Sequence, residues 1–214
     1  MTVLFTSGYP YSGKTEFAKA LAAEFKGLAA VVHIDPMSLR PPEYATLPLD
    51  EQKRARIAAW EVSQSMLTDA LKEPNSTLVI FDTCASKATS MMPHFTNAKV
   101  HKHDVVYVFV GATLPECRQR AGTNWPQHDV IAGYGKDFLD SIPKLKDLST
   151  KFFFIKNNND PARASLMLSA QKIAKAILNG EISGVLKSKP LRSSINRPRQ
   201  KGNKGPKIQS RRPV

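Results

Sequence analysis

Eight residues near the amino terminus have the types and the spacing of a phosphate-binding loop. They fit the pattern G-x-x-x-x-G-K-[ST] and are Gly8, Tyr9, Pro10, Tyr11, Ser12, Gly13, Lys14 and Thr15. The glycines let backbone N–H groups close around an anion, and a following helix points its N-terminus at the same anion. Lys14 would then reach the β- and γ-phosphates of a nucleoside triphosphate, and Thr15 would offer its hydroxyl to Mg²⁺. ATP and Mg²⁺ are the expected ligands, although the loop alone does not separate ATP from GTP.

Strands and helices must flank and position this loop, and the sequence supplies them. The apolar run Thr2–Thr6 predicts a buried strand, and apolar residues at every fourth position predict a helix over Lys14–Lys26. Further strands are predicted at Ala30–Ile34, Thr77–Phe81, Val105–Val110 and Phe152–Ile155. Two more helices are predicted, one capped by Asp50 and running to about Lys72, the other running from Asp160-Pro161 to near Gly180.

The near-continuous apolar character of these strands is typical of a parallel sheet that is covered on both faces. Strands alternate with helices, so the fold class is α/β. We expect a P-loop NTPase with a doubly wound, mainly parallel five-stranded sheet and helices on both faces. A chain of 214 residues suits one such domain, which we place at residues 1–186.

The last part of the chain, Lys187–Val214, differs in composition from the rest. It contains ten Lys or Arg residues and no acid, in a chain whose formal net charge is +13. It has almost no large apolar residues, so we expect a disordered basic tail. Nucleic acid is the favoured partner, DNA before RNA, because phosphates attract such a segment without base reading. A membrane surface, an acidic protein or an inert extension remain the alternatives.

Charged side chains follow the predicted strands at the edge where an α/β sheet binds its ligands. Asp35 follows the second strand, Asp82 follows the third, and Arg118 and Arg120 come after the fourth. One acid could accept the proton of an attacking hydroxyl, and the other could hold the water shell of Mg²⁺. The arginines could neutralise charge on a phosphoryl group during its transfer.

The order of these features resembles the P-loop kinases typified by phage polynucleotide kinase and the seryl-tRNA kinases, over roughly residues 1–180. The resemblance implies that Asp35 is the general base and that Arg118, with Arg120 as runner-up, is the lid residue on the phosphates. It also implies that Arg40 is a substrate-loop arginine. Where the family often has Asp-Asn or Asp-Ala followed by arginines, this chain has Asp82-Thr83-Cys84-Ala85-Ser86-Lys87.

Within that group the sequence is similar to the phage kinases that phosphorylate 5-hydroxymethyluracil in DNA during thymine hypermodification. The similarity lies in the small domain, the sequence of the phosphate-binding loop and the basic end. It implies that the acceptor is the 5-hydroxymethyl group of that base.

Two other functional classes stay open beside the first. A kinase of a free nucleoside or small metabolite explains the catalytic residues but leaves the tail without a role. A nucleotide-driven switch that binds nucleic acid is the third class, because Asn157-Asn158-Asn159-Asp160 loosely resembles the guanine-reading segment of GTPases. Trp125 and Tyr134 could stack on a base, although packing is the commoner role of such residues.

Composition limits the remaining classes. No run of residues approaches the roughly 18 apolar positions of a membrane span, and Met1 leads straight into the first strand without a signal-peptide pattern. The two cysteines and five histidines have neither a disulfide framework nor metal-ligand spacing. We therefore expect reduced thiols and a cytoplasmic location, which for a phage protein means the host cytoplasm.

Overall fold

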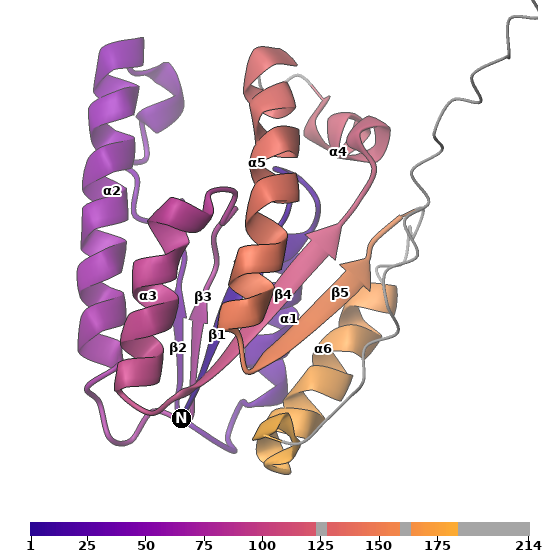
Figure 1. The fold of residues 1–214 in the computed structure, drawn as a ribbon. Coiled ribbons are helices and arrows are strands. Elements are labelled where there is room, and N and C mark those ends of the chain that lie inside the picture. The colour runs from indigo at the N-terminus through magenta and orange to yellow at the C-terminus, as the bar shows by residue number, and fades with distance from the viewer. Residues whose placement is uncertain (123–127, 159–163, 184–214) are drawn as a thin grey trace, which may run out of the picture.

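The computed structural model describes residues 1–122, 128–158 and 164–183, where strands and helices alternate (Figure 1). The strands are β1 (Thr2–Ser7), β2 (Val31–Ile34), β3 (Leu78–Phe81), β4 (Asp104–Gly111) and β5 (Lys151–Lys156). The helices are α1 (Lys14–Glu24), α2 (Leu49–Ala70), α3 (Ala88–Val100), α4 (Leu114–Ala121), α5 (His128–Leu148) and α6 (Ala164–Leu178), with 3-10 turns η1 (Tyr44–Thr46) and η3 (Glu181–Ser183). The tail 187–214, Trp125 and the expected helix start at Asp160 lie outside the described residues.

The five strands form one parallel sheet in the order β2-β3-β1-β4-β5, which confirms the predicted sheet. The strand β1 lies at its centre, with Thr2 in register with Leu78 of β3 and with Asp104 of β4. Because all strands run in the same direction, their carboxyl ends meet at one edge. The loops that carry the candidate residues therefore gather there.

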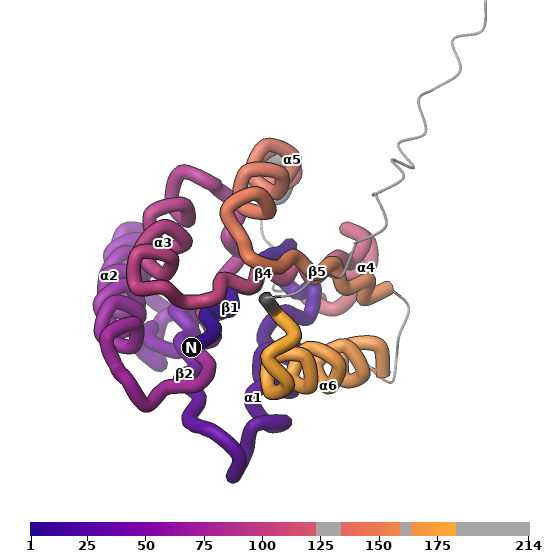
Figure 2. Tube along the Cα trace, turned by 60° about the horizontal axis from the view of Figure 1, so that its bottom comes forward, coloured from indigo at the N-terminus to yellow at the C-terminus, as the bar shows by residue number. Residues whose placement is uncertain are grey.

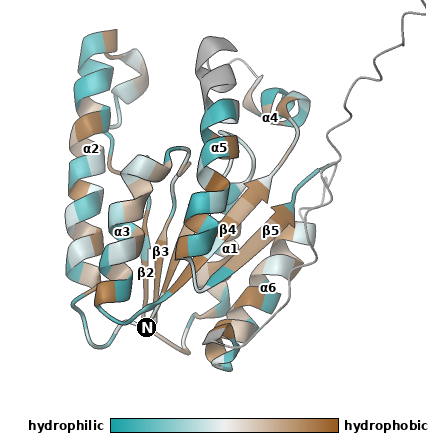
Figure 3. Ribbon diagram, in the orientation of Figure 1, coloured by the Kyte–Doolittle hydropathy of each residue, from teal (hydrophilic) through white to brown (hydrophobic). Residues whose placement is uncertain are grey.

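Helices cover both faces of the sheet, as predicted (Figure 2). One core lies between the sheet and α1 with α6, around Phe17 and Phe25. The other lies between the sheet and α2, α3 and α5, around Phe95. Neighbouring residues of β1 serve different cores, Leu4 the first and Phe5 the second, because side chains alternate along a strand. The strands are accordingly hydrophobic along most of their length (Figure 3).

The helix ends differ from the sequence-based expectation in one respect that has a physical reason. Helix α2 begins at Leu49 with Pro48 as its N-cap, so the prediction that Asp50 is the cap was wrong. The φ of Pro48, −54°, suits a helix start, and its carbonyl already accepts the N–H of Gln52. Asp50 lies in the first turn instead, where its charge complements the helix dipole.

Candidate active site

The loop between β1 and α1 has the backbone conformation that a phosphate-binding loop needs. Gly8 and Gly13 have φ values of 141° and 98°, which residues with a side chain rarely adopt. A Cβ atom on Gly8 would collide with the carbonyl oxygen of Val110, and one on Gly13 would collide with the side-chain amide of Asn157. Both motif glycines are therefore required by conformation and by space.

Lys14 turns inward across this loop. Its side chain is buried, and Nζ donates a hydrogen bond to the carbonyl oxygen of Tyr9 at 2.7 Å. Helix α1 begins at the same residue, so the positive end of the helix and the ammonium group face one point. This combination suits the β- and γ-phosphates of a nucleotide.

Asp82 is buried beside the first turn of α1. Its Oδ1 accepts a hydrogen bond from the hydroxyl of Thr6 at 2.8 Å. Burial by itself raises the pKa of Asp82, but the His33 ring and the hydroxyls of Thr15 and Thr6 lower it. The charge of Lys14 lowers it further, so the net pKa lies below the ordinary value. The carboxylate is therefore charged at neutral pH in spite of its burial.

The surroundings of Asp82 fit a hydrated Mg²⁺ ion. Its Oδ2 is buried and makes no hydrogen bond of normal length to a described residue, and His33 Nε2 lies 3.8 Å away. A buried charged oxygen that accepts no hydrogen bond from the described residues, next to the hydroxyl of Thr15, suits the water shell of Mg²⁺ in a phosphate-binding loop. The two predicted metal residues are thus brought together. His33 was not foreseen, because a lone histidine in an apolar strand carries no signal.

Asp35 stands where β2 ends, next to Asp82 in the sheet. The N–H of Asp82 donates to the carbonyl oxygen of Ile34 at 2.8 Å, which holds the two acids on adjacent strands. The side chain of Asp35 also closes a turn, because its Oδ1 accepts the N–H of Met37 at 2.8 Å. One carboxylate oxygen therefore has a structural bond, and the half-exposed carboxylate can still accept a proton.

Arg120, rather than Arg118, lies against the phosphate-binding loop. Its guanidinium donates to the carbonyl oxygens of Tyr11 and Ser12, each at 3.4 Å, and to that of Asn157 at 2.9 Å. The side chain of Arg118 is exposed and makes no hydrogen bond or ion pair with the part of the chain that is described. Both side chains belong to α4, which the capping box of Thr113 and Glu116 starts.

Asn157, directly after β5, also bonds to the phosphate-binding loop. Its Nδ2 donates to the carbonyl oxygen of Ser12 at 2.6 Å, and its backbone N–H donates to Gly111 at 2.7 Å. The amide thus ties the loop to β4 and β5 at once. The sequence singled out Asn157 only through a resemblance to GTPases, whereas the structure gives it a supporting role behind the loop.

The matched pair Arg120→Ala and Arg118→Ala tests this placement. We expect Arg120→Ala to raise the KM for ATP about tenfold, because about 0.5–1.5 kcal/mol per hydrogen bond is lost and 1.4 kcal/mol corresponds to a factor of ten. Arg118→Ala should change the KM by no more than about twofold. Steady-state kinetics against ATP give both values, with thermal unfolding as the control for folding. Equal values for the two variants would contradict the placement.

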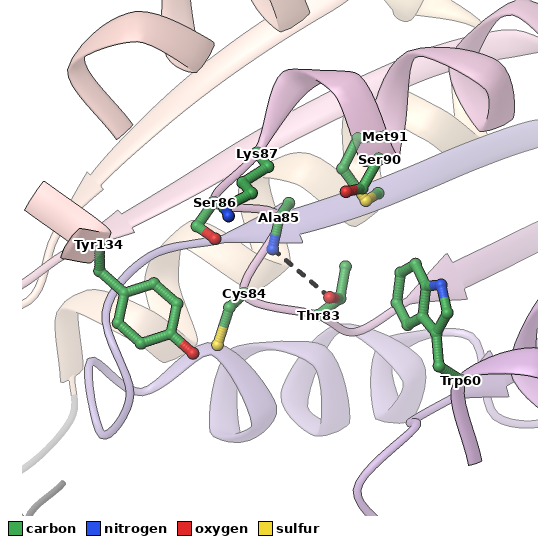
Figure 4. A pocket seen from close by; sticks show the side chains of 9 residues that line it. All are labelled: Trp60, Thr83, Cys84, Ala85, Ser86, Lys87, Ser90, Met91 and Tyr134. Atoms are coloured by element: carbon green, nitrogen blue, oxygen red, sulfur yellow. Dashed lines mark hydrogen bonds between the residues drawn. The ribbon is translucent and has the colours of Figure 1, made fainter. Parts of the chain in front are cut away.

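A pocket of about 190 Å³ opens beside the loop that follows β3 (Figure 4). Its walls come from α2, from the β3–α3 loop, from the first turn of α3 and from α5. The residues that line it are Trp60, Thr83, Cys84, Ala85, Ser86, Lys87, Ser90, Met91 and Tyr134. Of these residues only Tyr134 was predicted from the sequence to contact a ligand, because the pocket forms only when three segments far apart in the sequence meet.

The wall of this pocket is bonded directly to the strand that carries the phosphate-binding loop. The carbonyl oxygen of Cys84 accepts the hydroxyl of Ser7 at 3.0 Å and the N–H of Gly8 at 3.3 Å. Thr6 donates to the carbonyl oxygen of Thr83 at 3.1 Å. The pocket therefore adjoins the site that the loop forms for phosphates.

A row of aromatic rings makes a second link between the two sites. Tyr9 of the phosphate-binding loop packs edge-on against Phe138, with ring centroids 5.1 Å apart. Phe138 in turn stacks with Tyr134, one helical turn earlier in α5, at 6.1 Å. Helix α5 thus contacts the phosphate-binding loop and lines the pocket with the same face.

Charged groups of both signs act on the pocket. Burial raises the pKa of the Tyr134 hydroxyl, and Cys84 and Asp137 add to this, whereas the charges of Arg56 and Arg40 lower it. Arg40, predicted to contact the substrate, also stacks over the Tyr44 ring at 4.7 Å. Lys87 lines the pocket and lies 4.0 Å from Asp137.

Solved structures with the same fold include several kinases. A structure of the PezAT chromosomal toxin–antitoxin system of Streptococcus pneumoniae matches with a TM-score of 0.57 and 16% identity, over 86% of this chain and 88% of that one. Shikimate kinase from Acinetobacter baumannii, in complex with shikimate, matches with a TM-score of 0.52 and 15% identity, over 85% and 95%. The Mycobacterium tuberculosis APS kinase, in complex with AMPPNP and APS, matches with a TM-score of 0.52 and 16% identity, over 83% of this chain and 97% of that one.

These similarities define the class of fold. The chain has the P-loop NTPase fold, with the parallel five-stranded sheet that shikimate kinase and APS kinase also have. No family profile and no curated protein gives a significant match to the sequence. Within residues 1–122, 128–158 and 164–183, no helix is long and apolar enough to cross a membrane.

Proposed function

We propose that this protein is an ATP- and Mg²⁺-dependent kinase that phosphorylates a hydroxyl group on nucleic acid. The favoured acceptor is the 5-hydroxymethyl group of 5-hydroxymethyluracil in phage DNA. The observation that carries the proposal is the pocket beside the phosphate-binding loop, because a phosphotransferase needs an acceptor site next to its nucleotide site. A pocket with cations around it suits an acceptor that carries phosphates of its own.

The residues divide the reaction among them. The backbone of the loop and Lys14 hold the β- and γ-phosphates, and Thr15 and Asp82 would hold the ion that neutralises their charge. Asp35 accepts the proton of the acceptor hydroxyl while the oxygen of that hydroxyl bonds to the γ-phosphorus. The bond from that phosphorus to the β,γ-bridging oxygen breaks, and ADP leaves. Arg120 steadies the loop during the transfer through its bonds to the loop carbonyls.

A kinase of a free nucleoside or small metabolite is the second candidate. The volume of the pocket, about 190 Å³, is compatible with it, because a cavity of this size admits a small group. A panel of acceptors separates the candidates: hydroxymethyluracil DNA, plain DNA, tRNA, the free nucleoside and no acceptor, each with γ-labelled ATP. Label in nucleic acid supports the proposal. Label only in the nucleoside supports the alternative, and free phosphate alone would indicate a nucleotide-driven switch.

The basic tail is expected to bind the nucleic acid without taking part in the chemistry. Ten cations lie in Lys187–Val214, and neutralising about five phosphates of duplex DNA would give a salt slope near −4 to −5 in log K against log salt. A chain ending at residue 186 should lose most of that slope, with a higher KM for DNA and a kcat within a few-fold. A full-length control with the ten cations changed to glutamine should behave like the truncation. Equal slopes for all three proteins would show that the tail does not touch DNA.

A further inference from the structure

Two aromatic side chains stand at opposite ends of the pocket. Figure 4 shows Tyr134 at one end and Trp60 at the other, with Thr83 and Cys84 between them. Each ring is held by packing: Trp60 lies edge-on to Phe81 at 5.6 Å, and Tyr134 stacks with Phe138. Fixed aromatic surfaces at the ends of a small cavity are suited to stacking against another planar ring.

The polar groups of the pocket lie between these rings. Ser86, Ser90 and Cys84 line it and carry two hydroxyl groups and a thiol (Figure 4). Hydroxyl groups both donate and accept hydrogen bonds, so they can pair with the polar edge of a heterocycle. A cavity with aromatic ends and polar sides therefore has the chemistry of a nucleobase site.

The cations lie where the remainder of such a ligand would pass. Arg56 precedes Trp60 by one turn of α2, so the two side chains share a face of the helix. The charge of Arg40 lowers the pKa of Tyr134, and Lys87 lines the pocket from the end of the β3–α3 loop with a side chain that is 63% exposed. Lys87 at the pocket, and Arg56 on the face of α2 that carries Trp60, suit a base whose phosphates stay outside a cavity that admits only one ring.

We propose, resting on the nucleic-acid kinase function above, that the pocket binds a single base turned out of its stack, between Trp60 and Tyr134. Arg40, Arg56 and Lys87 then hold the flanking phosphates. A base inside a duplex cannot enter a cavity of this size with its partner, so the acceptor must be extruded or already unpaired. The turned-out base is thereby brought next to the loop that holds the γ-phosphate.

Leucine substitutions test the ring contacts, because leucine keeps apolar bulk and removes the aromatic face. Stacking is worth about 1–3 kcal/mol per base, so Trp60→Leu and Tyr134→Leu should each lower kcat/KM for the nucleic-acid acceptor by about 5- to 150-fold. The KM for ATP should stay unchanged in Trp60→Leu, and Trp60→Phe should restore most of the loss. The matched controls are Val62→Leu on α2 and Leu139→Ala on α5, both exposed positions. Normal kcat/KM in both leucine variants would overturn the proposal.

Base pairing of the acceptor gives a second test. The wild-type protein should prefer the modified base in a single strand over a mismatched duplex, and a mismatched over a matched duplex, because unpairing takes up binding free energy. Equal kcat/KM for all three acceptors would overturn the turned-out geometry, even if transfer to nucleic acid is efficient.

Fluorescence separates failure of the pocket from failure of the kinase function. The chain has two tryptophans, so Trp125→Phe leaves Trp60 as the sole one. Adding a short single-stranded oligonucleotide that contains 5-hydroxymethyluracil should quench Trp60 in this protein, and Tyr134→Leu should weaken that quenching. If the wild-type protein phosphorylates no nucleic acid, the proposed function fails while quenching would still support the base site. If it phosphorylates nucleic acid and Trp60 is not quenched, the base site fails alone.

Discussion

Replacing Lys14 is expected to lower phosphotransfer by about 10³-fold or more. A full positive charge that meets the transferring phosphoryl group is worth at least as much as a neutral oxyanion donor, whose removal lowers kcat by about 10²–10³-fold. Lys14 is only 8% exposed, and its side chain bonds to the carbonyl oxygen of Tyr9. Lys14→Met is therefore the better variant than Lys14→Ala, because it keeps the stem and removes the charge.

The control for this variant is Lys19→Met on the same helix, where the side chain is exposed. Steady-state rates at saturating ATP and acceptor should differ by about three orders of magnitude between Lys14→Met and Lys19→Met, while their melting temperatures stay close. Transfer at the wild-type rate by Lys14→Met would remove the loop from the chemistry.

Asp35→Asn is expected to lower kcat by about 10²–10⁴-fold, the usual contribution of a general base. The asparagine side chain keeps an oxygen that can accept the N–H of Met37, so the turn after β2 should survive. The substitution therefore separates the two roles of this residue. If Asp35 only closes the turn, asparagine replaces it and turnover does not change; if Asp35 takes the proton, turnover falls and stability does not.

Asp69→Asn, at an exposed position on α2, is the matched control for the loss of one charge. The KM for ATP should stay within about twofold in both variants. An increase in that KM as large as the fall in kcat would place Asp35 in the nucleotide or metal site instead.

The sheet and the phosphate-binding loop could be predicted because their signals are local. The buried strands are continuous apolar runs, and the glycines of the loop stand at positions where the backbone admits no side chain. Helices α3 and α5 could not be predicted in the same way. Each contains an internal proline, Pro93 and Pro143, which in a sequence argues for an interruption. The N-terminus of α3 also depends on a distant residue, because Ser141 of α5 accepts the N–H of Ala88.

In the candidate site, too, some features could be predicted from local sequence and others depend on contacts between distant segments. Thr15 and Asp82 were predicted together, because residues at the carboxyl ends of neighbouring strands must lie close. Asn157 and Ser12 are 145 positions apart, and nothing local marks their bond. The choice between Arg118 and Arg120 likewise depended on how α4 turns toward the loop. The pocket needs three distant segments in place, so Trp60 had no signal in the sequence beyond its aromatic ring.

Kinase activity itself is tested most directly by counting phosphate. The wild-type protein is incubated with γ-labelled ATP and a single-stranded oligonucleotide that carries one 5-hydroxymethyluracil, and the ADP formed is compared with the label in the oligonucleotide. We predict close to one labelled phosphate on the oligonucleotide per ADP, located on the 5-hydroxymethyl group after digestion to nucleosides, and neither product with Lys14→Met. ADP accompanied by an equal amount of free phosphate, with no label in the oligonucleotide or in any other acceptor, would contradict it.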